Sequence, residues 1–361
     1  NDTILNLGNY SIEDAGNISV ISNNGDVLNI GKYYTESGNI HMEAHDDLIN
    51  LGVMETEAGN INLSSLNGSL HNEAGADLLT GDGNITLAAK SATAELYYSV
   101  IDANNNIVDT FVDPQDSRLH SYSDGDKKGS MYYQDDSGVI HDVIKNGSVF
   151  NAGDAMAING TITMTSAHGD VTNYDDFNTL STNDAHVFSK EYNGISIATG
   201  NVAIIAENGT LYNTKDLESG ENITLTAANG LTNFAYNVYA GKDITLTATS
   251  GNVENISVLE SIYGDVTLIA QNGSVINGRE SASASGDIIT LGGTVKLQAT
   301  GDVRNYGDII AIGKTMGDVA GSGSIVLKSE QGSVYNYDDF NTLHDGSTIN
   351  YAYEAGKHII V

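Results

Sequence analysis

Short segments in which apolar and polar residues alternate recur along the whole chain. Each segment reads as Ile or Val, any residue, a large aliphatic residue, any residue, and then Ala or Ser, as in "GNITLAA", "ENITLTA" and "GDVTLIA". Alternation with period two predicts β-strands that bury one face. The last inward position is small in all eleven copies, which indicates a crowded corner where the chain bends: Ser22, Ala44, Ser65, Ala89, Ser166, Ala206, Ala227, Ala248, Ala270, Ala299 and Ser329.

A second phrase, an aliphatic residue followed by any residue and then Asn, comes about nine residues after each of these segments. Many neighbouring Asn residues are 20 to 23 positions apart. A Gly usually precedes each phrase, as expected where a chain turns. The recurring Asn residues are Asn6, Asn29, Asn50, Asn72, Asn151, Asn173, Asn213, Asn233, Asn255, Asn277, Asn305 and Asn336.

A repeat of this length predicts a solenoid. About 21 residues with short strands are too few for a crossover that contains a helix. We therefore predict an all-β fold, a parallel β-helix of about 12 coils that winds to the right. Coils stacked at the usual strand spacing would form one rod, roughly 60 Å long, over residues 1–361. The recurring Asn side chains would form an internal ladder, each amide donating to one neighbour and accepting from the other.

Longer spacings between ladder Asn residues indicate insertions that leave the rod. The largest is predicted at 91–146, as a β-rich subdomain made of hairpins. Its strands are expected in "ELYYSVIDANNNIVDTFVD" and "SMYYQDDSGVIHDVI", with a turn at Asp135 to Gly138 in the second segment. Five tyrosines here either pack the subdomain together or form a recognition surface: Tyr97, Tyr98, Tyr122, Tyr132 and Tyr133.

The stretch "NYDDFNTL" occurs twice, from Asn173 and again from Asn336. Each copy follows a ladder Asn directly, so we predict that both open related smaller insertions, at 174–194 and 337–356. A catalytic centre is rarely duplicated together with its scaffold, whereas a module of an array is. We interpret the stretch as a candidate repeated, multivalent contact made by Asp175, Asp176, Phe177, Asp338, Asp339 and Phe340.

The net charge of the chain limits the kinds of molecule that it can be expected to bind. The chain has 47 acidic and 15 basic residues, for a net charge of −32. Phosphates would be repelled, so we expect no binding to nucleic acid, and a charged partner should be cationic or a metal ion. Because there is no Cys, disulfides and Cys-based metal sites are excluded. The sequence contains no apolar run long enough for a transmembrane segment.

The residues give little support for catalysis. A β-helix lyase would need an Arg or Lys base beside carboxylates that hold Ca²⁺, and of Arg118, Arg279 and Arg304 only Arg304 lies on the repeat. A hydrolase would need clustered carboxylates, whereas the outward strand positions are mostly Thr, Ser, Asn and Lys. We therefore predict no catalytic or cofactor-binding residues and no metal ligands. Ca²⁺ at acidic loops such as Ser123–Gly129 ("SDGDKKG") is the one cofactor left open.

The phrase "GNITLTAxNGxVxN", with its Asn at a fixed place in each coil, resembles the repeats of filamentous haemagglutinin-type exoproteins. These are two-partner-secretion adhesins of Gram-negative-type bacteria, among them leukotoxin-like filamentous adhesins. The resemblance covers nearly the whole chain outside the large insertion. It implies a right-handed β-helix rod that is secreted through an outer-membrane transporter. It also implies binding to a host or bacterial cell-surface receptor or glycan, although it assigns no binding residue.

We therefore expect a fragment of a longer, secreted adhesin displayed on the bacterial cell surface. It would attach to host cells, matrix, glycans or other bacteria, with the rod as spacer and the insertions as contact surfaces. Two alternatives stay open. The segment is purely a structural spacer of a large exoprotein or toxin-delivery filament, or it is a β-helix enzyme that degrades polysaccharides.

Overall fold

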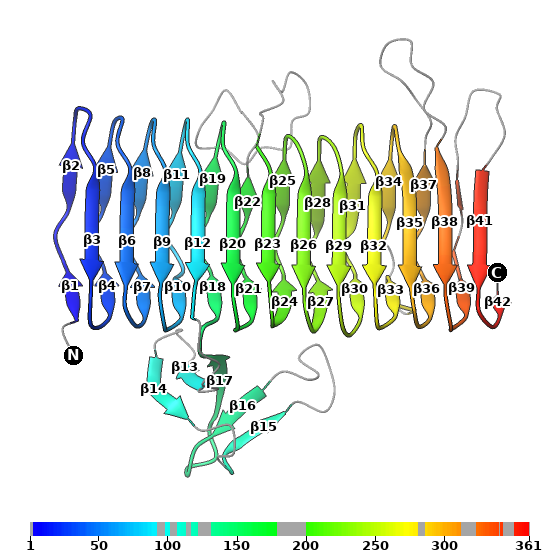
Figure 1. Cartoon of the computed structure of the whole chain (residues 1–361), viewed down its shortest axis with the longest axis horizontal. Coiled ribbons are helices and arrows are strands. Elements are labelled where there is room, and N and C mark those ends of the chain that lie inside the picture. Colours follow the sequence, from blue (N-terminus) through cyan, green and yellow to red (C-terminus); the bar gives the residue numbers. More distant parts are fainter. Residues whose placement is uncertain are drawn as a thin grey trace.

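The chain forms a single long rod from which one small sheet projects (Figure 1). The computed structural model describes residues 3–91, 98–101, 107–112, 117–121, 131–178, 200–280, 286–311, 323–338, 340–341 and 350–360. Three parallel sheets run the length of the rod, and every coil adds one strand to each. The predicted parallel β-helix of about 12 coils is confirmed, because two of the sheets have 12 strands and the third has 13.

Sheet A contains the strands that end in the ladder Asn. Its strands are β1 (Ile4–Asn6), β4 (Val27–Asn29), β7 (Leu48–Asn50), β10 (Leu70–Asn72), β18 (Val149–Asn151), β21 (Val171–Asn173), β24 (Thr210–Asn213), β27 (Gly230–Asn233), β30 (Val253–Asn255), β33 (Val275–Asn277), β36 (Val303–Asn305), β39 (Val334–Asn336) and β42 (Ile359–Ile360).

Sheet B is formed by the short strands that follow each ladder Asn. Its strands are β2 (Tyr10–Ile12), β5 (Tyr33–Thr35), β8 (Met54–Thr56), β11 (Leu78–Thr80), β19 (Ala155–Ala157), β22 (Phe177–Asn178), β25 (Leu217–Ser219), β28 (Asn237–Ala240), β31 (Val258–Ser261), β34 (Ile288–Thr290), β37 (Ile309–Ala311) and β40 (Phe340–Asn341).

Sheet C carries the longer alternating segments that end in Ala or Ser. Its strands are β3 (Ile18–Ser22), β6 (Ile40–Ala44), β9 (Ile61–Ser65), β12 (Ile85–Ala89), β20 (Ile162–Ser166), β23 (Val202–Ala206), β26 (Ile223–Ala227), β29 (Ile244–Ala248), β32 (Val266–Ala270), β35 (Thr294–Ala299), β38 (Ser324–Ser329) and β41 (Asn350–Ala355). In Figure 1 the chain rises on the far side and descends on the near side as it advances, which is the predicted right-handed winding.

The inward side chains of the three sheets form one continuous apolar core, which runs from Ile18 to Val334. The Asn ladder runs along this core as predicted. Each ladder amide nitrogen donates to the side-chain oxygen of the next ladder Asn, at 2.6 Å for Asn6 to Asn29 and 2.7 to 2.9 Å for most other pairs. The second amide hydrogen is donated to a carbonyl at the following corner, such as Gly52 O at 2.9 Å from Asn50. The buried amides are thereby satisfied on both sides, and they hold neighbouring coils in one register.

The corners of the coils are stacked as closely as the strands. A Cβ added to Gly52 would lie 2.1 Å from the carbonyl oxygen of Gly31 in the preceding coil, so a side chain does not fit there. At many corners an Asp, Asn or Ser side chain accepts a backbone N–H from the next coil. Examples are Asn60 N–H to Asn39 at 2.9 Å and Asp265 N–H to Asp243 at 2.8 Å. Part of the acidic charge therefore has a structural role that the sequence analysis did not predict.

The two hairpins expected in the large insertion are present. They form a separate antiparallel sheet of five strands in the order β14 (Ile107–Val112), β13 (Tyr98–Ile101), β17 (Ile140–Lys145), β16 (Met131–Gln134) and β15 (Leu119–Ser121). Ser91 is buried in the rod, and a Cβ built on Gly147, whose φ is +79°, would lie 3.4 Å from Ser91 Cβ. The chain therefore leaves and rejoins the rod at one place, and the subdomain spans 92–146.

The predicted bounds of the two smaller insertions are wrong. The rod continues past Tyr174 and Tyr337, because Phe177–Asn178 and Phe340–Asn341 are strands of sheet B. The strand β41 (Asn350–Ala355), which pairs with β38 in sheet C, lies inside the predicted second insertion, and β42 then pairs with β39 in sheet A. The predicted start of each insertion is therefore one strand too early. Residues 179–199 and 342–349 lie outside the described residues.

Candidate functional site

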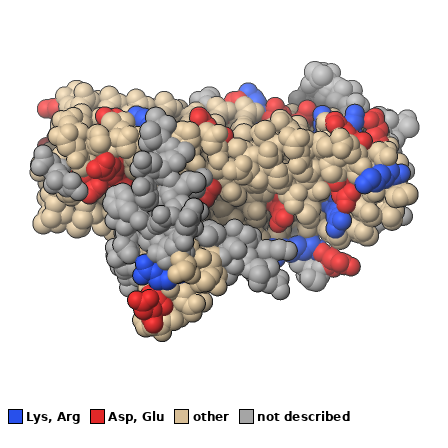
Figure 2. All heavy atoms as spheres, turned by 60° about the horizontal axis from the view of Figure 1, so that its bottom comes forward, with Lys and Arg blue, Asp and Glu red and all other residues tan. Residues whose placement is uncertain are grey.

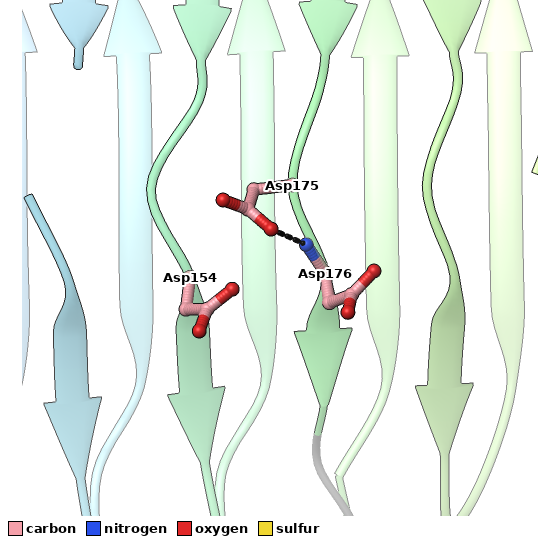
Figure 3. A group of neighbouring side chains, drawn as sticks. All are labelled: Asp154, Asp175 and Asp176. Atoms are coloured by element: carbon pink, nitrogen blue, oxygen red, sulfur yellow. Dashed lines mark hydrogen bonds between the residues drawn. The ribbon is translucent and has the colours of Figure 1, made fainter. Parts of the chain in front are cut away.

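Three carboxylates meet on the outside of the rod at the corner between sheets A and B. Asp154 comes from the coil of β19, and Asp175 and Asp176 come from the next coil, just before β22 (Figure 3). One side-chain oxygen of each lies within 4.8 Å of the others. All three side chains are partly buried. We call these three residues the Asp trio.

The repeat itself brings the Asp trio together. Parallel pairing of Ala155 with Phe177 stacks the residues that precede these strands, so Asp154 lies beside Asp176. Asp175 occupies the corner position that holds Gly153 in the preceding coil. Its side-chain oxygen accepts the N–H of Asp176 at 2.9 Å, and its carbonyl accepts the amide of ladder Asn173 at 2.7 Å.

The electrostatics of the Asp trio favour protonation of Asp154 and Asp176. Burial, followed by a hydrogen bond with Asp175 and repulsion from it, raises the pKa of Asp154 to about 7. Burial, followed by repulsion from Asp216, raises the pKa of Asp176, although the Asp216 N–H donates to Asp176 Oδ1 at 3.0 Å. Asp154 is therefore protonated in a large fraction of the molecules near neutral pH.

The Asp trio can hold a proton, and its oxygens are of the kind that hard divalent cations prefer. Among the residues that the structure describes, the Asp trio is the group of carboxylates and imidazoles whose ligand atoms lie close enough together to hold a metal ion. The sequence predicts Asp175 and Asp176 as contact residues but gives no such indication for Asp154. The register of the coils was the signal that could have found it, because Asp154 and Asp176 each come three residues after a ladder Asn, immediately before a strand of sheet B.

Phe177 is not a contact residue, and its inclusion in the candidate contact was wrong. Its side chain is fully buried in the core, because it is the first inward residue of β22. In the second copy, Phe340 begins the corresponding strand, which pairs with β37. Asp338 is exposed, and Asp339 lies outside the described residues. The exposed aromatic residue of each copy is instead the tyrosine, with 39% of Tyr174 and 55% of Tyr337 accessible.

The candidate tyrosines of the subdomain do not form one exposed surface among the residues whose side chains are described. Tyr133 is buried beneath the Arg118 guanidinium, which lies 4.9 Å from the ring centroid. Tyr132 is half-buried and lies against the ring of His120. Tyr97, Tyr122 and the side chain of Tyr98 lie outside the described residues. For Tyr133 the packing interpretation is the correct one.

Two other candidate sites from the sequence have different outcomes. Arg304 lies on β36 as expected, where it forms an ion pair with Asp302 at 3.0 Å and stacks on Tyr335. A cation held in this way is a poor base, because its pKa is raised by Asp302. The acidic loop Ser123–Gly129, where Ca²⁺ was left open, lies outside the described residues.

Comparison with known proteins found no matching protein family, no matching curated protein and no matching solved structure. Within the described ranges, no helix has the length and apolar character needed to cross a membrane.

Proposed function

We propose that the chain is a segment of a secreted bacterial adhesin, displayed on the cell surface after export through an outer-membrane transporter. The rod holds contact surfaces away from the cell, and these surfaces attach to host cells, matrix, glycans or other bacteria. One observation carries the proposal. The Tyr-Asp-Asp segment occurs twice directly after a ladder Asn, and both copies expose the tyrosine on the same corner of a rigid rod. A surface element repeated along a stiff scaffold suits multivalent attachment.

The direct test is attachment of host and bacterial cells to a surface coated with the whole chain. We expect saturable attachment that soluble chain inhibits. A screen of cells, matrix proteins and glycan arrays that finds no ligand would contradict the proposal and favour the purely structural spacer.

The subdomain can be tested separately because its removal leaves a standard coil. Joining Ser91 to Gly147 gives "AKSGSV" between β12 and β18, which matches "SLNGSL" between β9 and β10 in length. We expect this variant, which lacks 92–146, to keep the circular dichroism of a β-rod and to attach fewer cells. Unchanged attachment would remove the subdomain from the proposed contact surfaces.

The Asp trio supports a second candidate, cleavage of a polysaccharide. Glycoside hydrolysis needs one protonated carboxyl group as the acid and a second, ionised carboxylate as base or nucleophile. Asp154, with a pKa of about 7, fits the acid, and Asp175 or Asp176 fits the second group. The test is release of reducing ends from a panel of polysaccharides. Asp154→Asn should abolish release and the corner variant Asp243→Asn should not. No release by the unmodified chain would reject this candidate.

A further inference from the structure

The outer face of sheet A differs in chemistry from the rest of the rod. Most of its central outward residues are apolar or aromatic, and two of them, His71 and Phe150, are buried: Leu5, Leu28, Ile49, His71, Phe150, Thr172, Tyr212, Thr232, Glu254, Ile276, Arg304 and Tyr335. Figure 2, in which this side of the rod is turned forward, shows a broad area beside the subdomain with few charged side chains. A molecule with a net charge of −32 thus keeps an area with little charge beside the subdomain.

A first aromatic cluster on this face surrounds Tyr174. The centroid of the Tyr174 ring lies 5.3 Å from that of Phe150 and 6.2 Å from that of Tyr212. Tyr212 in turn lies 5.5 Å from Phe234. The Arg279 guanidinium lies over the far end of the cluster, 4.7 Å from the Phe234 centroid. The four rings form a continuous track across successive coils, in which neighbouring planes are tilted by 53° to 63°.

A second aromatic cluster surrounds Tyr337. Its ring is stacked on Tyr306, with centroids 4.8 Å apart and planes within 9°. It is also parallel to Tyr335 at 6.1 Å, and Arg304 covers Tyr335. Tyr174 and Tyr337 both come directly after a ladder Asn, so both clusters are centred on the same corner of their coils. Six coil steps separate the two corners, which at the usual strand spacing is roughly 29 Å along a straight rod.

Acidic groups lie beside each cluster. Asp175 and Asp176 follow Tyr174, and exposed Asp338 follows Tyr337. Aromatic rings stack on the apolar faces of sugar rings and attract cations, while carboxylates accept hydrogen bonds from hydroxyl and ammonium groups. An anionic partner would be repelled by the charge of the rod, and a cationic one would be attracted. A peptide that binds by adding a strand needs a free sheet edge, whereas both clusters include residues of a sheet face.

We infer that the two clusters are a pair of binding sites for one linear polysaccharide whose sugars carry free amino groups, such as a glucosamine polymer. The chain of sugars lies along the outer face of sheet A. Its rings stack at Tyr174 and Tyr337, and its ammonium groups face the neighbouring carboxylates. The inference rests on the proposed attachment function and names the partner of the repeated contact.

Calorimetric titration with glucosamine oligomers of two lengths tests the inference, one shorter and one longer than roughly 29 Å. The longer oligomer should bind at least about 10-fold more tightly, because it reaches both clusters. Tyr174→Ala should remove this length advantage, and Tyr174→Ala with Tyr337→Ala should abolish binding of both oligomers. The matched control is Tyr263→Ala, since this ring is 46% exposed at the corner between β31 and β32. It should bind like the unmodified chain.

Three comparison ligands show whether charge alone explains any binding. Fully N-acetylated oligomers should bind more weakly, and acidic oligogalacturonates should not bind. Undiminished binding by the double tyrosine variant would overturn the inference, as would polylysine binding that depends on both tyrosines. If cells attach to the chain but no oligomer binds, the inference fails and the proposed attachment function stands. If no cells attach but the oligomers bind as expected, the proposed attachment function fails and the inferred polysaccharide sites stand.

Discussion

The inward and outward faces of sheet A differ in how regularly their residues repeat from coil to coil, although both faces belong to the same strands. The inward face places Asn at the same position in strand after strand, and each amide bonds to the next, as Asn233 does to Asn255 at 2.9 Å. The outward face has Leu5 in the first coil and aromatic or charged residues farther along. Coil stacking therefore constrains the inward residues of the rod, whereas the outward residues can vary and take functional roles.

The same contrast occurs inside the repeated stretch. Tyr174 and Phe177 are three residues apart, yet Tyr174 is 39% exposed and Phe177 is fully buried. The chain passes between them from the corner into β22, and the first residue of that strand points inward. Aromatic residues in a solenoid therefore have to be assigned to a face before they are assigned a role.

The largest expected effect is on stability when Phe177 is truncated. Phe177→Ala should lower the free energy of unfolding by about 3–5 kcal/mol, because it leaves a cavity in the continuous core. The matched change Tyr174→Ala should cost less than about 1 kcal/mol. Denaturant unfolding followed by circular dichroism compares the two variants. A cost at position 174 as large as that at 177 would contradict the assignment of inside and outside.

A smaller loss is expected from the middle of the ladder. Asn233→Ala leaves the amide of Asn213 and the side-chain oxygen of Asn255 without their partner in the core, at a cost of about 2–4 kcal/mol. The control is Asn60→Ala, because Asn60 bonds to Asn39 and Asn84 in the same stacked manner but at an exposed corner. It should cost about 1 kcal/mol or less. Equal losses in thermal unfolding would mean that burial does not distinguish the two sets of bonds.

The smallest expected effect is the pH dependence caused by the Asp trio. Because the pKa of Asp154 rises from an ordinary 3.8 to about 7 on folding, the folded state keeps a proton that the unfolded state releases. Stability should therefore fall as pH rises from about 4 to about 7. The expected loss is about 1 kcal/mol, since solvent screens a half-buried group.

Asp154→Asn should remove this slope and raise stability at pH 8. The control Asp243→Asn should leave the slope in place. Unfolding curves measured between pH 4 and pH 8 compare the two variants, and an unchanged slope in Asp154→Asn would contradict the raised pKa of Asp154.

Alternating residues and regular Asn spacing were enough to predict the fold, because every coil repeats the same inward pattern. The insertion bounds were less predictable. Phe177–Asn178 is a strand of two residues, too short to show alternation, and its place in sheet B depends on pairing with β19 and β25. The corner carboxylates were misread for a related reason. Asp243 and Asp265 look like solvated charge in the sequence, and only the stacked coils show that they accept the backbone N–H groups of Asp265 and Thr294.

The candidate site was only half predictable. Asp175 and Asp176 stood out as neighbours in a repeated stretch, whereas Asp154 is an isolated Asp whose partners become visible only when the coils are aligned. The subdomain tyrosines were chosen by composition, which does not distinguish buried Tyr133 from an exposed ring. The corner tyrosines Tyr174 and Tyr337 were visible in the sequence, but their exposure follows from the direction in which the chain leaves the ladder Asn.

The central claim is that the inward side chains stabilise the rod, whereas side chains on its outer surface contact the partner. Cell attachment by the variant that combines Tyr174→Ala with Tyr337→Ala tests this claim most directly, with thermal unfolding measured on the same samples. We predict an unfolding curve close to that of the unmodified chain and attachment lowered by about 10-fold, which corresponds to about 1.4 kcal/mol of binding free energy. Attachment equal to that of the unmodified chain, with the fold intact, would contradict the claim.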